Sequence, residues 1–300
     1  MSEISISVTQ EKKEKRSVHV GRIFVYAALI LYAIFIVAPF LTVIVTSLTP
    51  HLQLESTVGF VWKPKPITFS AYKAVFTEDT SIIFYGYSSM LRGFFNSIWQ
   101  TCVPLVIGSF VSALAAYAYS KLNVPGKEKF YAIEITTMMI PLGAFQIVEM
   151  IFYAKLNWIG TVFPLIIPGM FGCATTIFFF RSFFDGISNE ILEAAKIDGS
   201  GTVRNFFVIL VPLSIPSFMA QFILGFVGGY NDYVGPMLYL TGQHELVPLQ
   251  LAIKNLQDAF KNNNEIQCAS SIIGMLPLVV VFLFCQKFFL DGIAVGGGKE

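Results

Sequence analysis

The sequence is poor in charged residues, and this excludes an ordinary soluble domain. Of its 300 residues, 13% are charged and 55% are hydrophobic, and the mean hydropathy is +0.67. Soluble domains carry roughly 25% charged residues. The net charge is only +1, so bulk electrostatics favours neither nucleic acid nor an acidic partner. This composition indicates a membrane protein.

Residues suited to metal or disulfide chemistry are also scarce. The chain has four cysteines and three histidines. The cysteines lie inside apolar segments and are widely spaced, which predicts small buried hydrophobes and neither a metal site nor a disulfide framework. The histidines are scattered outside those segments, so we expect this chain to bind no metal and no cofactor. The residues are Cys102, Cys173, Cys268 and Cys285, with His19, His51 and His244.

Sequence motifs of enzymes are missing as well. A phosphate-binding loop has the pattern GxxxxGK[ST], but the GK pairs at Gly126 and Gly298 lack both the earlier Gly and the following Ser or Thr. Neither GxSxG nor HExxH occurs. We therefore expect that the chain is no enzyme by itself, and that energy for any transport comes from a gradient or a partner.

What the chain has instead is long apolar segments. A bilayer core about 30 Å thick needs about 20 mostly apolar residues per helix. Six segments meet this length once tilt and interruptions are allowed, which predicts an all-α polytopic membrane protein with six transmembrane helices. The fifth is too long for one crossing and contains Pro212 and Pro216, so we expect a kinked helix that continues into a re-entrant or interfacial piece. The segments are 23–48, 94–120, 130–154, 162–180, 206–240 and 268–290.

The distribution of Lys and Arg predicts the orientation. Thirteen of the twenty basic residues lie in the segments that share a side with the N-terminus, so both termini are expected in the cytoplasm. Residues 1–22 are then a basic cytoplasmic tail and 291–300 a second tail. Residues 49–93 form an extracytoplasmic segment, expected to be a small folded extension. The first apolar segment is too long for a signal peptide and indicates a retained span.

Two acidic residues lie within a predicted span. Glu134 and Glu149 are fifteen residues apart in segment 130–154, which on one continuous helix places them about 60° apart in azimuth and about 22 Å apart along the axis. They are not expected to pair. Buried acids are typical of gradient-driven carriers, but two isolated ones without an evident internal repeat give this alternative little support.

A polar stretch, SNEILEAAKIDGSG, separates the fourth and fifth apolar segments. Ser188 or Asn189 can act as an N-cap, and Glu190 then lies in the first turn, where the helix dipole favours a carboxylate. This predicts a short cytoplasmic helix over about 189–198.

The end of that helix is also marked. Ala194 and Ala195 leave part of its surface without bulk, which permits close approach of a partner. Gly199 and the residues after it stop the helix, and Thr202 is expected to cap the next one. The alternative is an ordinary surface loop with a helical turn.

The stretch EAAKIDGSGTVRNFFVILVPLSIP resembles the EAA signature of ABC importer membrane subunits. Further stretches resemble, in order and spacing, the carbohydrate-uptake class, specifically the second membrane subunit of maltose-type importers, a binding-protein-dependent transport inner membrane component. The resemblance implies a type I ABC importer permease fold, with a permease core over 94–290 and a coupling helix at about 189–199. The stretches are FFNSIWQT, SALAAYAYSKLNVPGKEKF, MMIP, YNDYVGPMLYL and QKFFLDGIAVGGGKE.

The resemblance also implies partners. The coupling helix would dock into a cleft of a cytoplasmic ABC ATPase, present in two copies, which uses ATP and Mg. A second permease subunit would complete the channel, and an extracytoplasmic solute-binding protein would deliver substrate. Glu193 would make polar contacts, Ala194 and Ala195 would permit close approach, and Gly199 would make the turn after Asp198.

The implied function is ATP-driven import of a sugar or oligosaccharide by alternating access across the cell (cytoplasmic) membrane. The alternative within the family is import of glycerol phosphate, a polyol or another small solute. Where the family pattern has an apolar residue followed by Pro, this chain has Val148 and Glu149, and the Glu149 carboxylate is suited to accept hydrogen bonds from sugar hydroxyl groups. Tyr230, Asn231 and Asp232 carry an aromatic ring, an amide and a carboxylate that suit sugar binding. The alternative role of these three residues is helix capping and packing. Residues expected along the substrate pathway are Met139, Pro141, Glu149, Tyr230, Asn231 and Asp232, and residues expected to reach the ATPase are Gly296, Gly297, Gly298 and Lys299.

Overall fold

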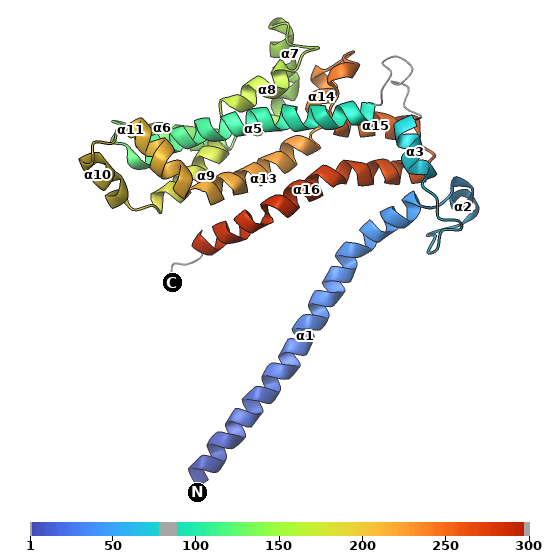
Figure 1. Cartoon of the computed structure of the whole chain (residues 1–300), viewed down its shortest axis with the longest axis horizontal. Helices are drawn as coiled ribbons and strands as arrows, with labels where there is room; N and C mark the ends of the chain where they lie inside the picture. The colour runs from blue at the N-terminus through green and yellow to red at the C-terminus, as the bar shows by residue number, and fades with distance from the viewer. Residues whose placement is uncertain (1, 78–88, 297–300) are drawn as a thin grey trace. The chain divides into compact units, whose positions relative to one another are not determined.

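The computed structural model describes residues 2–77 and 89–296, and within these ranges all regular secondary structure is helical (Figure 1). The chain divides into two compact units. The first consists of Met1–Lys73 with Phe260–Ile272, and the second of Ala74–Ala259 with Ile273–Glu300.

The first unit contains α1 (Ser2–Ser47) and α2 (His51–Ser56). Helix α1 includes an apolar stretch, Gly21–Ser47, long enough to cross a membrane. The helix also extends through the segment predicted as a basic tail, since it begins at Ser2. After α2 the chain returns to the end of α1, where the Thr68 amide donates to the Leu48 carbonyl over 3.0 Å.

Charged side chains hold α2 in place. His51 Nδ1 lies 3.0 Å from Glu265 Oε1 and its Nε2 lies 3.1 Å from Glu55 Oε1. The hydrogen bond with Glu265 raises the pKa of His51, because it favours the protonated ring. Segment 49–93 therefore contains folded structure, as far as the described residues extend; residues 78–88 lie outside them.

The second unit is built around α5 (Ser89–Lys121). Figure 1 shows α13 running alongside this helix, and α8, α9 and α15 also pack on it. The approach of α8 is close, because a Cβ atom added to Gly108 would collide with the carbonyl oxygen of Gly169. Small residues at helix contacts are typical of membrane helix packing. The packed helices are α8 (Phe163–Met170), α9 (Ala174–Asp185), α13 (Ile215–Asn231) and α15 (Leu249–Ala259).

Shorter helices connect these long ones. Near α5 and α9 lies α6 (Lys127–Thr137), followed by η1 (Leu142–Phe145) and α7 (Gln146–Lys155). Helix α16 (Asn264–Gly296) ends the described chain. The remaining elements are α3 (Ser70–Thr77), α10 (Asn189–Ile197), α11 (Thr202–Arg204), the π-helix η2 (Asn205–Leu210), α12 (Val211–Leu213), α14 (Val234–Tyr239) and η3 (His244–Leu246).

The expectation of one long helix over 130–154 is wrong. Helix α6 ends at Thr137 and α7 begins at Gln146. Pro141 explains the break, since its ring has no N–H and disfavours the helical conformation of the residue before it. The azimuth derived for Glu134 and Glu149 assumed a continuous helix and does not hold. Among the described residues, four helices and one bent pair are long and apolar enough to cross a membrane, and α6 and α7 are not among them.

The predicted kink in segment 206–240 is confirmed. The helical stretch Thr202–Leu213 and the following Ile215–Asn231 are bent by 74°. Ser214 lies at the bend, between the two prolines of the segment. After α13 the chain turns again at Asp232 and forms the short α14. The fourth segment is broken too, between α8 and α9, but Phe163–Asp185 as a whole is long enough for a crossing.

Candidate functional site

Helix α10 forms where the sequence predicts it and is capped at both ends. The Ser188 hydroxyl accepts from the Glu190 amide over 3.3 Å, which confirms the N-cap. At the other end Gly199 has a φ of +82°, a conformation that favours glycine. The Gly199 amide donates to the Lys196 carbonyl and the Ser200 amide to the Ala195 carbonyl. These bonds satisfy carbonyl groups at the end of the helix.

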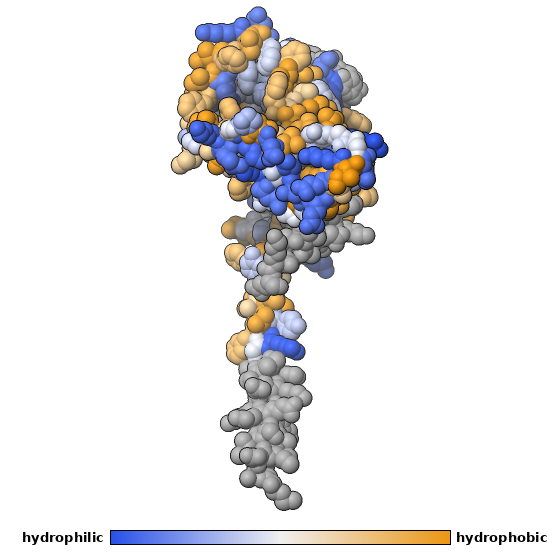
Figure 2. All heavy atoms as spheres, turned by 90° about the vertical axis from the view of Figure 1, so that its left-hand side faces the viewer, coloured by the Kyte–Doolittle hydropathy of each residue, from blue (hydrophilic) through white to orange (hydrophobic). Residues whose placement is uncertain are grey.

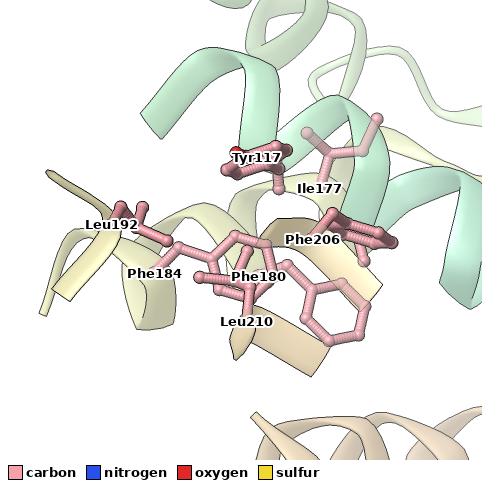
Figure 3. Close-up of a cluster of buried hydrophobic side chains, with 9 residues drawn as sticks. Tyr117, Ile177, Phe180, Phe184, Leu192, Phe206 and Leu210 are labelled. Carbon is pink, nitrogen blue, oxygen red and sulfur yellow. The ribbon is translucent and has the colours of Figure 1, made fainter. Parts of the chain in front are cut away.

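Helix α10 is anchored to the long helices by a single buried side chain. Leu192 belongs to a cluster of buried residues from α5, α9, η2 and α10, which we call the anchoring cluster (Figure 3). In Figure 3 Leu192 lies beside Phe184 at the edge of the cluster. Phe180 stacks on Phe184 with ring centroids 5.8 Å apart. The members are Ala113, Ala116, Tyr117, Ile177, Phe180, Phe184, Leu192, Phe206 and Leu210.

Polar contacts fix the approach to α10. Lys121 Nζ, at the end of α5, donates to the Ile187 carbonyl over 2.6 Å and to Asn189 Oδ1 over 2.8 Å. Arg181 forms two 2.9 Å hydrogen bonds to the Glu128 carboxylate and lies 3.8 Å from the Tyr131 ring centroid. Lys121 thus ties the connection between α9 and α10 to α5, and Arg181 ties α9 to α6.

The opposite face of α10 is open. Ile197 is 88% exposed, and Glu193 and Ala194 are exposed as well, while Ala195 is half-buried. Figure 2 turns this end of the second unit toward the viewer and shows hydrophilic surface with hydrophobic atoms in separate patches. This face of α10 therefore has no covering helix in the described part of the chain.

The connection after α10 differs from the prediction in one detail. Thr202 was expected to cap the next helix, but Gly201 occupies the cap position and Thr202 is the first helical residue. The π-helix η2 follows at once. Asn205 in η2 is fully buried, and neither amide atom of its side chain has a hydrogen-bond partner in the described part of the chain. Sequence analysis missed this, because a π-helix has no local sequence signal.

The residues predicted along the substrate pathway are not all brought together. Met139 and Pro141 lie in the exposed break between α6 and α7. Glu149 lies in α7, where the Tyr239 hydroxyl is 3.4 Å from Glu149 Oε2. Its contact is with α14, a helix far away in the sequence.

The YND residues have partners within the protein. Tyr230 is 1% exposed, and its hydroxyl donates to the Gly274 carbonyl over 2.8 Å. The side-chain amide of Asn231 donates to the Val227 carbonyl. Asp232 Oδ1 accepts from the backbone amides of the first residues of α14. This placement favours capping and packing; contact of these side chains with substrate stays a prediction.

Sequence analysis also missed a cleft in the second unit. It has a volume of about 320 Å³ and lies between α5, α8, α9, α13 and α14. Asp232 is the only residue predicted along the pathway that lines it among the described residues. Of the residues predicted to reach an ATPase, Gly296 ends α16, and Gly297, Gly298 and Lys299 lie outside the described residues.

The sequence is similar to those of known proteins over most of its length. The family described as binding-protein-dependent transport system inner membrane component matches residues 105–294. The arabinooligosaccharides transport system permease protein AraQ of Halalkalibacterium halodurans is 28% identical over 88% of this chain and 91% of its own length. The sn-glycerol-3-phosphate transport system permease protein UgpE of Yersinia pestis is 34% identical over 61% of this chain and 65% of its own.

Solved structures share the fold. A chain of a bacterial ABC transporter involved in the import of the acidic polysaccharide alginate has a TM-score of 0.77, with 23% identity, over 91% of this chain and 98% of its own. A chain of a bacterial alginate ABC transporter in complex with an alginate pentasaccharide-bound periplasmic protein has a TM-score of 0.60, with 14% identity, over 87% and 91%.

Proposed function

The chain belongs to the family of binding-protein-dependent transport system inner membrane components, and from this premise we propose that it is a permease subunit of an ATP-driven importer of a sugar or oligosaccharide. It forms half of the transmembrane pathway and works by alternating access between outward-open and inward-open states. The relatives named for arabinooligosaccharides and the alginate transporters support a saccharide. The relative named for sn-glycerol 3-phosphate keeps a small phosphorylated solute as the second candidate.

Six transmembrane helices complete the proposal. Helices α1, α5 and α16 each cross once, α8 continues into α9, and the bent pair around Ser214 forms one crossing. The sixth crossing needs α6 and α7 to act together across their break. The excess of Lys and Arg supports a cytoplasmic location for both termini, and the proposal assigns the chain to the cytoplasmic membrane.

The observation that carries the proposal is the construction of α10. It is anchored through Leu192 to a cluster shared by the long helices, and its exposed face carries Glu193, Ala194 and Ile197. A helix so held can move as a rigid body with the spans. We therefore assign it as the coupling helix, which docks on one of two cytoplasmic ATPase copies. ATP and Mg are used there, and the chain's other partners are a second permease subunit and a solute-binding protein.

The coupling assignment is tested by a pair of glycines. Gly199→Val forces a β-branched residue into positive φ, which costs about 1–2 kcal/mol and unwinds the end of α10. Gly201→Val is the matched control, because Gly201 has a φ of −79° and an added Cβ meets nothing within 4 Å. In the reconstituted transporter we expect Gly199→Val to lose most sugar uptake per ATP hydrolysed, and Gly201→Val to keep it. Equal coupling ratios in the two variants would sink the assignment.

Glu149 is the second testable residue. If its carboxylate accepts sugar hydroxyl groups, Glu149→Gln lowers uptake of neutral sugars at matched membrane levels. Tyr239→Phe is the control, since it removes the hydroxyl that contacts Glu149 and leaves the carboxylate. We expect a larger loss for Glu149→Gln. The same loss in both variants would mean that the pair holds α7 against α14 and does not bind substrate.

A further inference from the structure

The cleft of the second unit has the size of a site for one small ligand. Its volume of about 320 Å³ is at the lower end of the roughly 300–1,000 Å³ typical of small-molecule sites. At about 30 Å³ per water molecule it has room for about ten waters, and so for a single sugar ring. One wall is formed by a face of α5, with residues at helical spacing from Ser97 to Ser112.

Four residues of α5 present hydroxyl groups to the cleft. Two of these hydroxyls accept hydrogen bonds from backbone amides of the protein, and two have no such bond among the described residues. Ser97 Oγ accepts from the Leu249 amide over 2.8 Å, and Ser112 Oγ from the Cys173 amide over 3.3 Å. Thr101 and Ser109 are each only 8% exposed and line the cleft. Neither hydroxyl has a hydrogen-bond partner in the part of the chain that the structure describes. Buried hydroxyls normally have partners, so these two are available to a ligand.

The other side of the cleft supplies acceptors. Asp232 lines it, and with Oδ1 engaged in capping α14 its Oδ2 is left without a hydrogen bond among the described residues. Thr176 Oγ1 receives the Gln221 amide group over 2.9 Å and lies 3.1 Å from Cys173 Sγ. The described lining contains no Lys, Arg or His. A carboxylate without a basic neighbour repels anions, so the chemistry favours a neutral ligand.

We infer that this cleft is a binding site for one ring of a neutral sugar, or for a polyol, whose hydroxyl groups pair with Thr101, Ser109 and Asp232. The inference rests on the proposed transport function and selects among its substrates: it disfavours phosphorylated and uronic acid ligands. No aromatic side chain is among the described lining residues, so there is no stacking platform and binding is weak. Weak binding suits a site along a pathway, because the ligand must leave it again.

Cys173 offers a direct test, because it is an exposed residue on the wall of the cleft. The complete transporter in nanodiscs is treated with N-ethylmaleimide, and modification of Cys173 is followed by mass spectrometry. The probes are D-glucose, L-arabinose and glycerol, compared with D-glucuronate and sn-glycerol 3-phosphate at equal concentration and ionic strength. At a concentration that fills about 80% of the sites, we expect at least one neutral probe to slow modification about fivefold, and the anions to have no effect.

Variants test whether protection of Cys173 depends on the hydroxyl groups of Thr101 and Ser109. Thr101→Val with Ser109→Ala should abolish protection by the neutral probe. Thr42→Val, which removes a hydroxyl bonded within α1, should leave it intact. Protection by the anions equal to that by sugars, or none by any neutral probe, overturns the inference. Uptake with ATP is measured in proteoliposomes of the same preparation: uptake without protection refutes the site alone, and protection without uptake refutes the transport function alone.

Discussion

Two stretches of helix α5 have opposite surroundings. Ala113, Ala116 and Tyr117 lie in the anchoring cluster, together with aromatic side chains such as Phe180, which is 0% exposed. The preceding turns border the cleft of about 320 Å³, where the hydroxyls of Thr101 and Ser109 have no hydrogen-bond partner among the described residues. Within one helix, the closely packed part holds α10, and the loosely packed part borders the cleft that we propose as a ligand site.

The comparison has a physical basis. Closely packed aromatic rings have few alternative arrangements, so a displacement of α10 is passed on to α5 and α9. A wall of hydroxyl groups can instead exchange water for ligand at little cost. We therefore expect substitutions in the anchoring cluster to lower the free energy of unfolding strongly, and substitutions of residues that line the cleft to lower it weakly.

The largest effect is expected for Phe180→Ala. The Phe180 ring lies 4.5 Å from the Phe218 ring and 5.8 Å from the Phe184 ring, centroid to centroid, and its removal leaves a cavity that costs roughly 3–5 kcal/mol. Phe178→Ala is the control, since Phe178 is on the same helix and 50% exposed. The Tm of the purified complex should fall much further for Phe180→Ala. Equal losses would mean that the cluster is not the rigid part of the unit.

A smaller effect of opposite sign is expected for Asn205→Leu. Within the described ranges, both polar atoms of the Asn205 side chain are buried without hydrogen-bond partners, and such a group costs about 1–3 kcal/mol. A leucine, which has the same branching and number of side-chain heavy atoms, should therefore raise the Tm if the surrounding residues accommodate its larger methyl groups. The same measurement on Ser214→Ala, another buried residue with an unpaired hydroxyl, gives an independent check. A lower Tm for Asn205→Leu would show that the amide is needed in η2.

The smallest effects on stability are expected for two serines of α5 that lie three residues apart, Ser109 and Ser112, and the two effects should differ. Ser112→Ala leaves the Cys173 amide without its acceptor and should cost about 1 kcal/mol. Ser109→Ala removes a hydroxyl without a protein partner and should change stability by less than about 0.5 kcal/mol. Thermal unfolding of the two variants side by side decides this. A large loss for Ser109→Ala would make that hydroxyl structural.

Helix α10 was predictable because its signals are local. Ser188 and Gly199 cap it within the stretch itself, and the observed bounds, Asn189–Ile197, agree with the prediction within one or two residues. The bend of the fifth segment was signalled by its prolines in the same way. Both features depend on backbone chemistry that a few neighbouring residues determine.

The break after α6 was missed for the opposite reason. By hydropathy, residues 130–154 form one apolar segment. Hydropathy does not register that Pro141 interrupts the helical backbone within it. The cleft, and the contact between Glu149 and Tyr239, depend on residues far apart in the sequence. The contacts of α14 with α7 and α8 join segments far apart in the sequence, so local patterns do not indicate which side chains surround the predicted pathway residues.

The 74° bend at Ser214 has a mechanical consequence. The helical stretch Thr202–Leu213 is an arm about 18 Å long, at 1.5 Å per residue, joined to α10 at one end and to α13 at the other. If this arm pivots by about 10° at Ser214, its far end travels about 3 Å. Because Phe206 and Leu210 of this stretch belong to the anchoring cluster, we expect α10, the cluster and the stretch to move together. The bend at Ser214 then turns that displacement into a change in the tilt of α13 beside the cleft.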